Sequence, residues 1–127
     1  MLELARSRNC YGALIGDDRV VVQPLSGRLE AHCAANIEGL IEHRGIGILQ
    51  TSHAASALIH LAVDLLPRGQ ELPRIAIREE TIDEIAGIAV PRLILGGAAS
   101  PFERAYAVIE ELDRRSRGQT GAIANFA

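Results

Sequence analysis

Short runs of strand-forming residues, separated by residues that favour turns, occupy most of this sequence. Residues 24–27 (Pro, Leu, Ser, Gly) and residues 86–87 (Ala, Gly) each divide two such runs. Proline, serine and glycine between β-branched runs are typical of hairpin turns. The pattern therefore predicts a strand-rich fold with one β-hairpin over residues 19–32 and a second over residues 80–95.

Three further segments are also predicted to form strands. Residues 13–15 are a short apolar run, which we expect to be a buried strand ending before two adjacent aspartates. The β-branched residues and glycines of residues 36–49 favour a turn leading into a strand over a helix. The apolar run 56–66 fits a buried strand or a buried helix by periodicity alone, and its short length before Pro67 favours the strand.

Helices are predicted at the two ends of the chain. Residues 2–10 suit the last turns of a helix. Near the other end, Ser100 precedes Pro101 and lies three positions before Glu103, which is the capping-box pattern of a helix start. We expect this helix to end at Gly118. Its predicted apolar face consists of Phe102, Ala105, Tyr106, Ile109 and Leu112.

The length of 127 residues is that of one domain. With 48% hydrophobic and 23% charged residues, the composition is that of a folded protein and not of a disordered one. Aromatic residues make up 3% and there is no tryptophan, so the core must be aliphatic. We expect the domain to span residues 1–118, followed by a flexible tail over residues 119–127.

Charge, cysteines, histidines and hydropathy argue against several classes of function. The net charge is −3 and the basic residues are scattered, which does not fit a nucleic-acid binder. Cys10 and Cys33 form no CxxC motif and the four histidines show no zinc spacing, so we expect two reduced thiols and no zinc site. No apolar run reaches the roughly 18 residues that span a bilayer, and no export signal begins the sequence. We therefore expect no membrane partner and a cytoplasmic location.

Two adjacent carboxylates, Asp17 and Asp18, are the main candidate for a functional site. Each makes ionisation of the other less favourable, so their juxtaposition needs a reason. One interpretation is a polar turn at the end of a strand. The other is a site for a metal ion or for proton transfer. The residues by themselves leave both interpretations open.

Four segments together resemble the bacterial HPr kinase/phosphorylase family, in particular its short form that consists of the catalytic domain. "GDDRVVV" (16–22) resembles the acidic pair of that family, and "IEHRGIGI" (41–48) resembles its signature segment. "PRIAIREET" (73–81) resembles the segment that contains a catalytic arginine, and "AGIAVPRLIL" (86–95) a penultimate pair of strands. The resemblance runs in the family's order from about residue 2 to about residue 112. It implies an α/β fold with a P-loop-kinase-like core, a strand-rich mixed sheet and a C-terminal helix.

The resemblance also implies roles for individual residues. Asp18 matches the aspartate that accepts the proton of the serine hydroxyl, and Arg74 matches the catalytic arginine. Glu42 matches the signature glutamate and is implied as a magnesium ligand, together with Asp17. The remaining signature positions are Arg44, Gly45 and Gly47. Apart from the resemblance, Glu42 and Arg44 fit an ion pair on a solvated face, and the two glycines fit a bulge or tight turn.

ATP, Mg²⁺, the phosphocarrier protein HPr as acceptor, and homo-oligomers are implied by the same resemblance. However, the first strand and the P-loop, Gly-x-x-x-x-Gly-Lys-Ser/Thr, are missing from the sequence. All 13 basic residues are arginine, so no lysine can hold the phosphates of a nucleotide. Two hypotheses remain: a truncated or degenerate HPr(Ser) kinase, and a non-catalytic protein-binding module derived from that fold. Loss of a central strand would expose a sheet edge, so we expect self-association.

Overall fold

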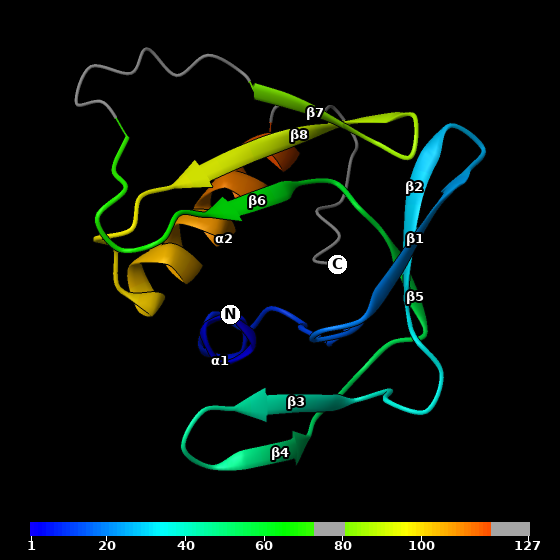
Figure 1. The fold of residues 1–127 in the computed structure, drawn as a ribbon, viewed down its shortest axis with the longest axis horizontal. Helices are drawn as coiled ribbons and strands as arrows, with labels where there is room; N and C mark the ends of the chain where they lie inside the picture. The colour runs from blue at the N-terminus through cyan, green and yellow to red at the C-terminus, as the bar shows by residue number, and fades with distance from the viewer. Residues whose placement is uncertain (73–80, 118–127) are drawn as a thin grey trace.

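The computed structural model describes residues 1–72 and 81–117. Arg74 and the predicted tail 119–127 lie outside this part of the chain. The described residues form two helices and eight strands (Figure 1). In chain order these are α1 (Leu2–Ser7), β1 (Val20–Leu25), β2 (Arg28–Cys33), β3 (Leu40–His43), β4 (Gly47–Gln50), β5 (Ser56–Leu58), β6 (Ala62–Leu65), β7 (Thr81–Ile85), β8 (Ile88–Leu95) and α2 (Pro101–Arg117).

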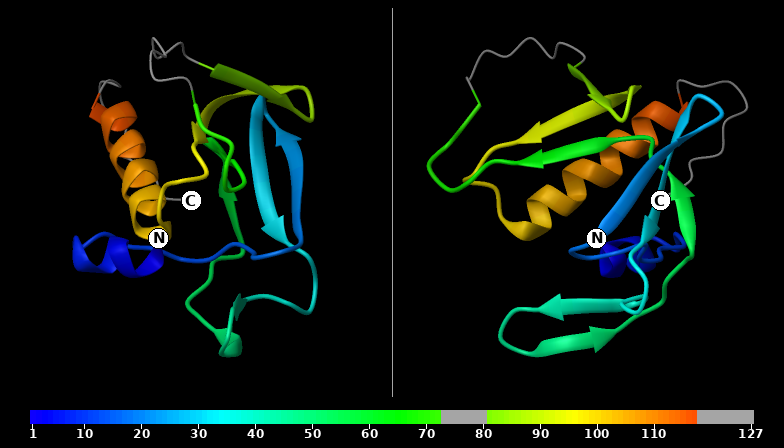
Figure 2. Two further views of the ribbon diagram at one scale, coloured as in Figure 1. Left: turned by 60° about the vertical axis from the view of Figure 1, so that its left-hand side comes forward. Right: turned by 45° about the vertical axis from the view of Figure 1, so that its right-hand side comes forward.

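The strands of the described residues form three small sheets instead of the single mixed sheet that we expected. Their strand orders are β1-β2-β5, β3-β4 and β6-β8-β7. Only the third is mixed, because β8 pairs parallel with β6 and antiparallel with β7. Helix α2 runs along one side of this third sheet, and the β1-β2-β5 sheet lies toward its other side (Figure 2). The strand-rich α/β class with a C-terminal helix is confirmed.

Both predicted hairpins are present, and their turns have the expected chemistry. In the first, Ser26 and Gly27 have φ of 50° and 78°; in the second, Ala86 and Gly87 have φ of 50° and 77°. Two consecutive residues with positive φ form the type I′ turn, whose twist matches that of the flanking strands. The first turn is shorter than predicted, because Pro24 belongs to β1. Pro24 causes no loss of a ladder hydrogen bond in β1, since β1 is an edge strand.

Pro91 lies inside β8, the central strand of its sheet. It pairs with Ile82 of β7, and the parallel pairing with β6 begins one residue later, at Arg92. From the alternation of the β7–β8 ladder, the nitrogen of Pro91 faces the β6 side, where no strand is yet paired. The missing N–H therefore costs no ladder hydrogen bond.

One strand prediction was wrong, and another was correct in the type of element but not in the number of strands. Residues 13–15 do not form a strand; Leu14 makes an isolated parallel bridge with His53. The run 56–66 is two strands, β5 and β6, which belong to different sheets. The chain leaves the first sheet at Ile59, whose N–H donates to the carbonyl of Leu29 at 2.8 Å. The unbroken apolar run does not reveal that the chain passes from one sheet to another, because both strands are partly buried and so both are apolar.

Helix α2 begins as predicted. The N–H of Glu103 donates to Oγ of Ser100 at 3.2 Å, and the N–H of Ser100 donates to the Glu103 carboxylate at 2.6 Å, which completes the capping box. The predicted end at Gly118 lies outside the described residues. The apolar face is partly wrong, because Phe102 and Tyr106 are 65% and 44% exposed. Their rings stack on each other with centroids 6.4 Å apart.

The core is small and aliphatic. Its buried apolar members among the described residues are Ala5, Leu29, Ala31, Val90, Val108 and Ile109. They come from α1, β2, β8 and α2. This confirms the expectation of a core without aromatic side chains for the described part of the chain. Across residues 1–72 and 81–117, neither helix has the length and apolar character needed to traverse a bilayer.

The β3–β4 hairpin is separate from the other sheets (Figure 1). Leu40, Ile46, Ile48 and Leu49 are 37%, 66%, 71% and 41% exposed, respectively. The prediction of strand instead of helix over residues 36–49 is confirmed. Instead of a turn leading into one strand, both arms are strands.

Candidate functional site

Asp17 and Asp18 lie in the loop between the Leu14 bridge and β1, and both are exposed. They do not end a buried strand as predicted, because the strand over residues 13–15 is absent. The neighbouring Gly16 is tightly enclosed, since a Cβ there would lie 2.8 Å from a methyl group of Val20 and 3.5 Å from the sulfur of Cys33. A larger residue would therefore displace the loop that positions the two carboxylates.

Asp17 is joined to the signature segment by a hydrogen bond. Its Oδ2 accepts the backbone N–H of Glu42 at 2.9 Å. Glu42 pairs with Ile48 in the hairpin. The N–H of Thr51 donates to the carbonyl of Gly39, so these two residues form a hydrogen-bonded pair. Hydrogen-bonded and non-hydrogen-bonded pairs alternate along the ladder, which makes Glu42 and Ile48 a non-hydrogen-bonded pair. The N–H of Glu42 therefore points away from β4 and toward Asp17. Two of the residues that the resemblance implies as metal ligands are thus brought together.

Arg44 and Gly45 lie in the turn of the same hairpin, and Gly47 is the first residue of β4. The N–H of Ile46 donates to the carbonyl of His43 at 3.0 Å, which closes the turn around Arg44 and Gly45. Gly45 and Gly47 have φ of 81° and 116°, and a Cβ at either would meet nothing within 4 Å. Glycine therefore suits these positions for its backbone conformation and not for close packing.

The alternative of an ion pair between Glu42 and Arg44 is not realised in the described part of the chain, where the arginines that form ion pairs do so with other carboxylates. Both side chains are exposed. Arg74, the other predicted catalytic residue, lies outside the described residues. Of the residues predicted for the site, the structure therefore describes Asp17 and Asp18 on one loop and Glu42 on the adjoining strand, with Arg44 two positions beyond Glu42.

This group suits a magnesium ion better than a tightly coordinated metal. No cluster of three or more His, Cys, Asp or Glu side chains occurs within residues 1–72 and 81–117. Mg²⁺ in phosphoryl-transfer sites commonly takes one or two protein carboxylates and completes its coordination with water and phosphate oxygens. Asp17 keeps one carboxylate oxygen beyond the one that accepts the Glu42 N–H, and the Glu42 side chain is exposed. The residue types fit magnesium and do not fit zinc.

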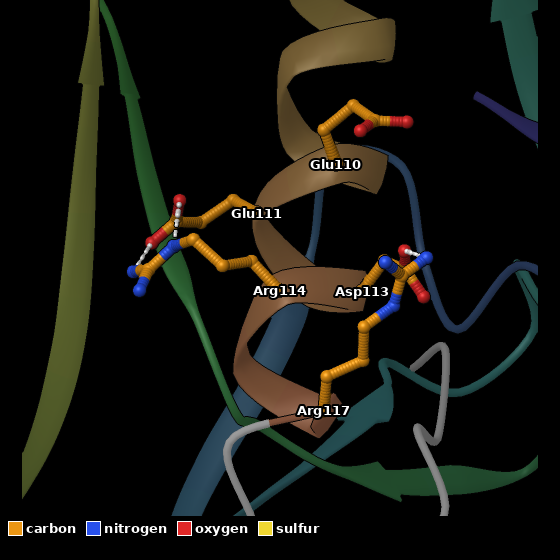
Figure 3. Close-up of a pocket in the computed structure, with 5 residues that line it drawn as sticks. All are labelled: Glu110, Glu111, Asp113, Arg114 and Arg117. Carbon is orange, nitrogen blue, oxygen red and sulfur yellow. Dashed lines mark hydrogen bonds and ion pairs between the residues drawn. The ribbon is translucent and has the colours of Figure 1, made fainter.

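A pocket of about 400 Å³ lies along the C-terminal half of α2 and contains none of these residues. It is lined by Glu110, Glu111, Asp113, Arg114 and Arg117 (Figure 3). Arg114 reaches back to Glu111 at 2.7 Å, and Arg117 reaches Asp113 at 2.5 Å. Cations in the last turn complement the helix dipole, and these charges already pair within the helix. The pocket is therefore part of the helix surface and not a second candidate for the site.

Glu110, at the upper end of the same pocket, contacts helix α1 instead. Its carboxylate accepts a hydrogen bond from the Arg8 guanidinium at 2.8 Å, which raises the pKa of Arg8 above its ordinary value. The Arg8 guanidinium also lies 4.9 Å from the centroid of the Tyr106 ring. These contacts fasten α1, and with it the start of the loop that leads to Asp17, to α2.

Sequence interpretation missed Glu71, which organises the loop between β8 and α2. Its Oε1 accepts the N–H of Ala98 at 2.5 Å, and its carboxylate lies against Gly96, where a Cβ would overlap it. Next to it, a Cβ on Gly97 would overlap the carbonyl oxygen of Pro67. The adjacent glycines were the available signal, because two consecutive glycines before a capping box indicate close approach of other chain segments.

Comparison with known proteins finds a solved structure with a similar fold. No protein-family model matches this sequence, and no curated protein matches it. Among solved structures the chain is similar to the HPr(Ser) kinase/phosphatase from Coxiella burnetii, with a TM-score of 0.69 and 23% sequence identity. The match covers 91% of this chain and 74% of that chain. The chain therefore shares the fold of an HPr(Ser) kinase/phosphatase.

Proposed function

We propose that this chain is an HPr(Ser)-kinase-like domain that supplies the acceptor side of phosphoryl transfer to a serine of HPr. The observation that carries the proposal is the likeness of nearly the whole fold to an HPr(Ser) kinase/phosphatase, over 91% of the chain. The hydrogen bond from the Glu42 backbone N–H to the Asp17 carboxylate supports it, because it holds the loop of Asp17 against the strand that carries Glu42, a residue far away in sequence.

Each residue of the site has a role in this proposal. Asp18 accepts the proton from the serine hydroxyl of the acceptor. Its carboxylate suits this role because it is exposed, so that a serine of another protein can reach it. Asp17 and Glu42 hold Mg²⁺, which neutralises phosphate charge when it is bound. Arg74 stabilises negative charge on the transferring group, as a cation does in other phosphoryl-transfer sites. Arg44, Gly45 and Gly47 shape the turn beside Glu42.

The 127 residues do not fit a nucleoside triphosphate in the same way. The sequence has no lysine and no Gly-x-x-x-x-Gly-Lys-Ser/Thr segment, so it lacks the lysine and the backbone cradle that hold β- and γ-phosphates. Groups that hold the nucleotide must come from outside these residues. The proposal therefore assigns acceptor-side roles and derives no step at the nucleotide.

A second candidate is a non-catalytic module that binds a partner protein through the same fold. The absence of lysine from the sequence favours it, as does the hydrogen bond by which the Asp17 carboxylate fastens the β3–β4 hairpin. In this case the carboxylates have a structural role. The fold keeps a surface that contacts a partner protein and does not carry out catalysis.

One experiment separates the two candidates. Purified HPr is incubated with the chain, Mg²⁺ and ATP, and phosphoserine is measured by mass spectrometry; HPr with its acceptor serine changed to alanine is the control. The same assay is run on the longest in-frame product of the gene, because nucleotide-holding groups could be encoded there. Phosphoserine that Asp18→Asn abolishes supports the kinase proposal. Association with HPr without ATP binding by calorimetry supports the binding module. If neither phosphorylation nor association occurs, both candidates fail.

A further inference from the structure

The two strands of the β3–β4 hairpin expose different backbone groups at their outer edges. Hydrogen-bonded and non-hydrogen-bonded pairs alternate along an antiparallel ladder. The bond from the Thr51 N–H to the Gly39 carbonyl fixes the phase of this alternation. Leu40 and Glu42 of β3, and their partners Gln50 and Ile48 of β4, therefore direct their N–H and C=O groups away from the hairpin.

The outer edge of β3 is already occupied. The N–H of Leu40 donates to the carbonyl of Ile37 at 3.2 Å, and the N–H of Glu42 donates to the Asp17 carboxylate at 2.9 Å. Both outward donors of this strand thus have partners within the chain. A further strand cannot pair there without displacing Asp17, which is one of the ways in which proteins protect a sheet edge.

The outer edge of β4 has no such protection in the part of the chain that the structure describes. Among the described residues, no strand pairs with this edge and no backbone hydrogen bond uses the outward N–H of Ile48 or Gln50. All four residues of β4 are exposed, and none of them is charged. Figure 1 shows β4 on the side of the hairpin that faces away from α1.

The other outer strands of the described sheets all have a feature that discourages pairing. Pro24 occupies an outward position of β1, where it offers no N–H. Strand β5 has only three residues. β6 contains Asp64, and β7 contains Asp83 and Glu84. Charges, prolines and short length are the usual means of protecting an edge, so β4 is the exception in this molecule.

We propose that β4 pairs with β4 of a second copy of this chain, in antiparallel orientation about a two-fold axis. An isolated two-stranded hairpin is marginally stable in water, and the pairing extends it to a four-stranded sheet across the two copies. A second copy suits this strand because Gly47–Gln50 holds no charge, so its pairing with itself brings no like charges together. A two-fold axis also closes the assembly at two chains.

The alternation restricts the register of the pairing, because an outward residue must face an outward residue of the second copy. Of the registers that this leaves, the proposed one sets Ile48 opposite Gln50 of the second copy and places Leu49 on the axis. Leu49 then faces Leu49 of the second copy across the axis, in a non-hydrogen-bonded pair with side chains about 4.5–5.5 Å apart. Leu49 is 41% exposed in the single chain, and the pairing covers it. This inference does not depend on the proposed kinase-like function.

Charge at Leu49 tests both the pairing and its register. We expect the unmodified chain to be a dimer by analytical ultracentrifugation, and Leu49→Lys and Leu49→Glu each to be monomeric, because like charges then face each other on the axis. An equimolar mixture of the two variants should regain the dimer, since opposite charges then meet. Val21→Lys, at a position of similar exposure on β1, is the matched control and should stay dimeric.

Several results would overturn the proposal. A monomeric unmodified chain excludes the pairing. Charged variants that stay dimeric, or a Val21→Lys control that alone dissociates, place the contact elsewhere. A mixture that stays monomeric while both variants keep the far-ultraviolet circular dichroism of the unmodified chain refutes the Leu49 register. A second measurement uses Leu49→Cys with Cys10 and Cys33 changed to serine, which should form a disulfide-linked dimer on mild oxidation.

Discussion

Replacing Asp17 by alanine removes the acceptor that fastens the β3–β4 hairpin to the loop before β1. The bond from the Glu42 N–H to the carboxylate is 2.9 Å long. A hydrogen bond to a charged group contributes about 1.5–3 kcal/mol and a neutral one about 0.5–1.5 kcal/mol. Because both residues are exposed, water replaces the lost acceptor, and we expect a loss of about 1 kcal/mol. In a domain of this size that lowers Tm by about 4 °C.

The measurement combines thermal unfolding with amide hydrogen exchange. If the hairpin opens locally, the Glu42 amide of Asp17→Ala should exchange about fivefold faster, as 1 kcal/mol implies. Asp17→Asn keeps an oxygen acceptor and should retain most of the Tm. Asp18→Ala is the matched control, because Asp18 is adjacent and exposed and makes no hydrogen bond to the Glu42 amide. An equal loss of Tm in Asp18→Ala, or an unchanged Glu42 exchange rate in Asp17→Ala, would refute the reasoning.

Three further predictions concern the start of α2. Gly97→Ala should lower the free energy of unfolding in urea by about 1–3 kcal/mol, because the new methyl group overlaps the Pro67 carbonyl; an unchanged value would contradict the packing. Ser100→Ala should cost about 1 kcal/mol in the same assay through loss of the helix cap, and a neutral result would argue against the capping box. The backbone N–H of Ser100, and secondarily its hydroxyl, lower the pKa of Glu103 below its ordinary value of 4.5. Glu103 therefore contributes stability above pH 4.5 that is lost as the pH falls through its lowered pKa, so Glu103→Gln should flatten Tm against pH on this acid side; an unchanged pH profile would count against it.

Elements whose signals are local could be predicted from the sequence. The turns at residues 26–27 and 86–87 need backbone conformations that glycine accommodates, and the strands on both sides follow from them. The start of α2 was predictable because Ser100 and Glu103 satisfy each other within one turn. The overall likeness to an HPr(Ser) kinase also followed from segments in their correct order, and the fold comparison supports it.

What depends on contacts between distant segments could not be predicted in this way. Residues 56–66 form one apolar run, and only the positions of two different sheets divide it. The helical pattern of Phe102 and Tyr106 indicates a buried face, yet these rings stack on each other at the surface beside Arg8. Periodicity identifies which residues share a face and does not say which element covers that face.

The candidate site shows the same division. The types of residue at Asp17, Asp18 and Glu42 suggested a carboxylate site from the sequence. Their juxtaposition depends on the phase of a hairpin ladder, which turns the N–H of Glu42 toward Asp17, and no spacing rule contains that information. Arg74 stays a prediction.

Strand β8 has a consequence for the order in which the molecule folds. Its pairing with β7 closes across a two-residue turn, whereas its pairing with β6 joins partners such as Ala62 and Arg92 that are thirty positions apart. Short loops close early and long ones late, because the entropy lost on closure grows with loop length. We therefore expect the β7–β8 hairpin to form first and to act as the template on which β6 assembles, so that slow refolding steps report the arrival of β6.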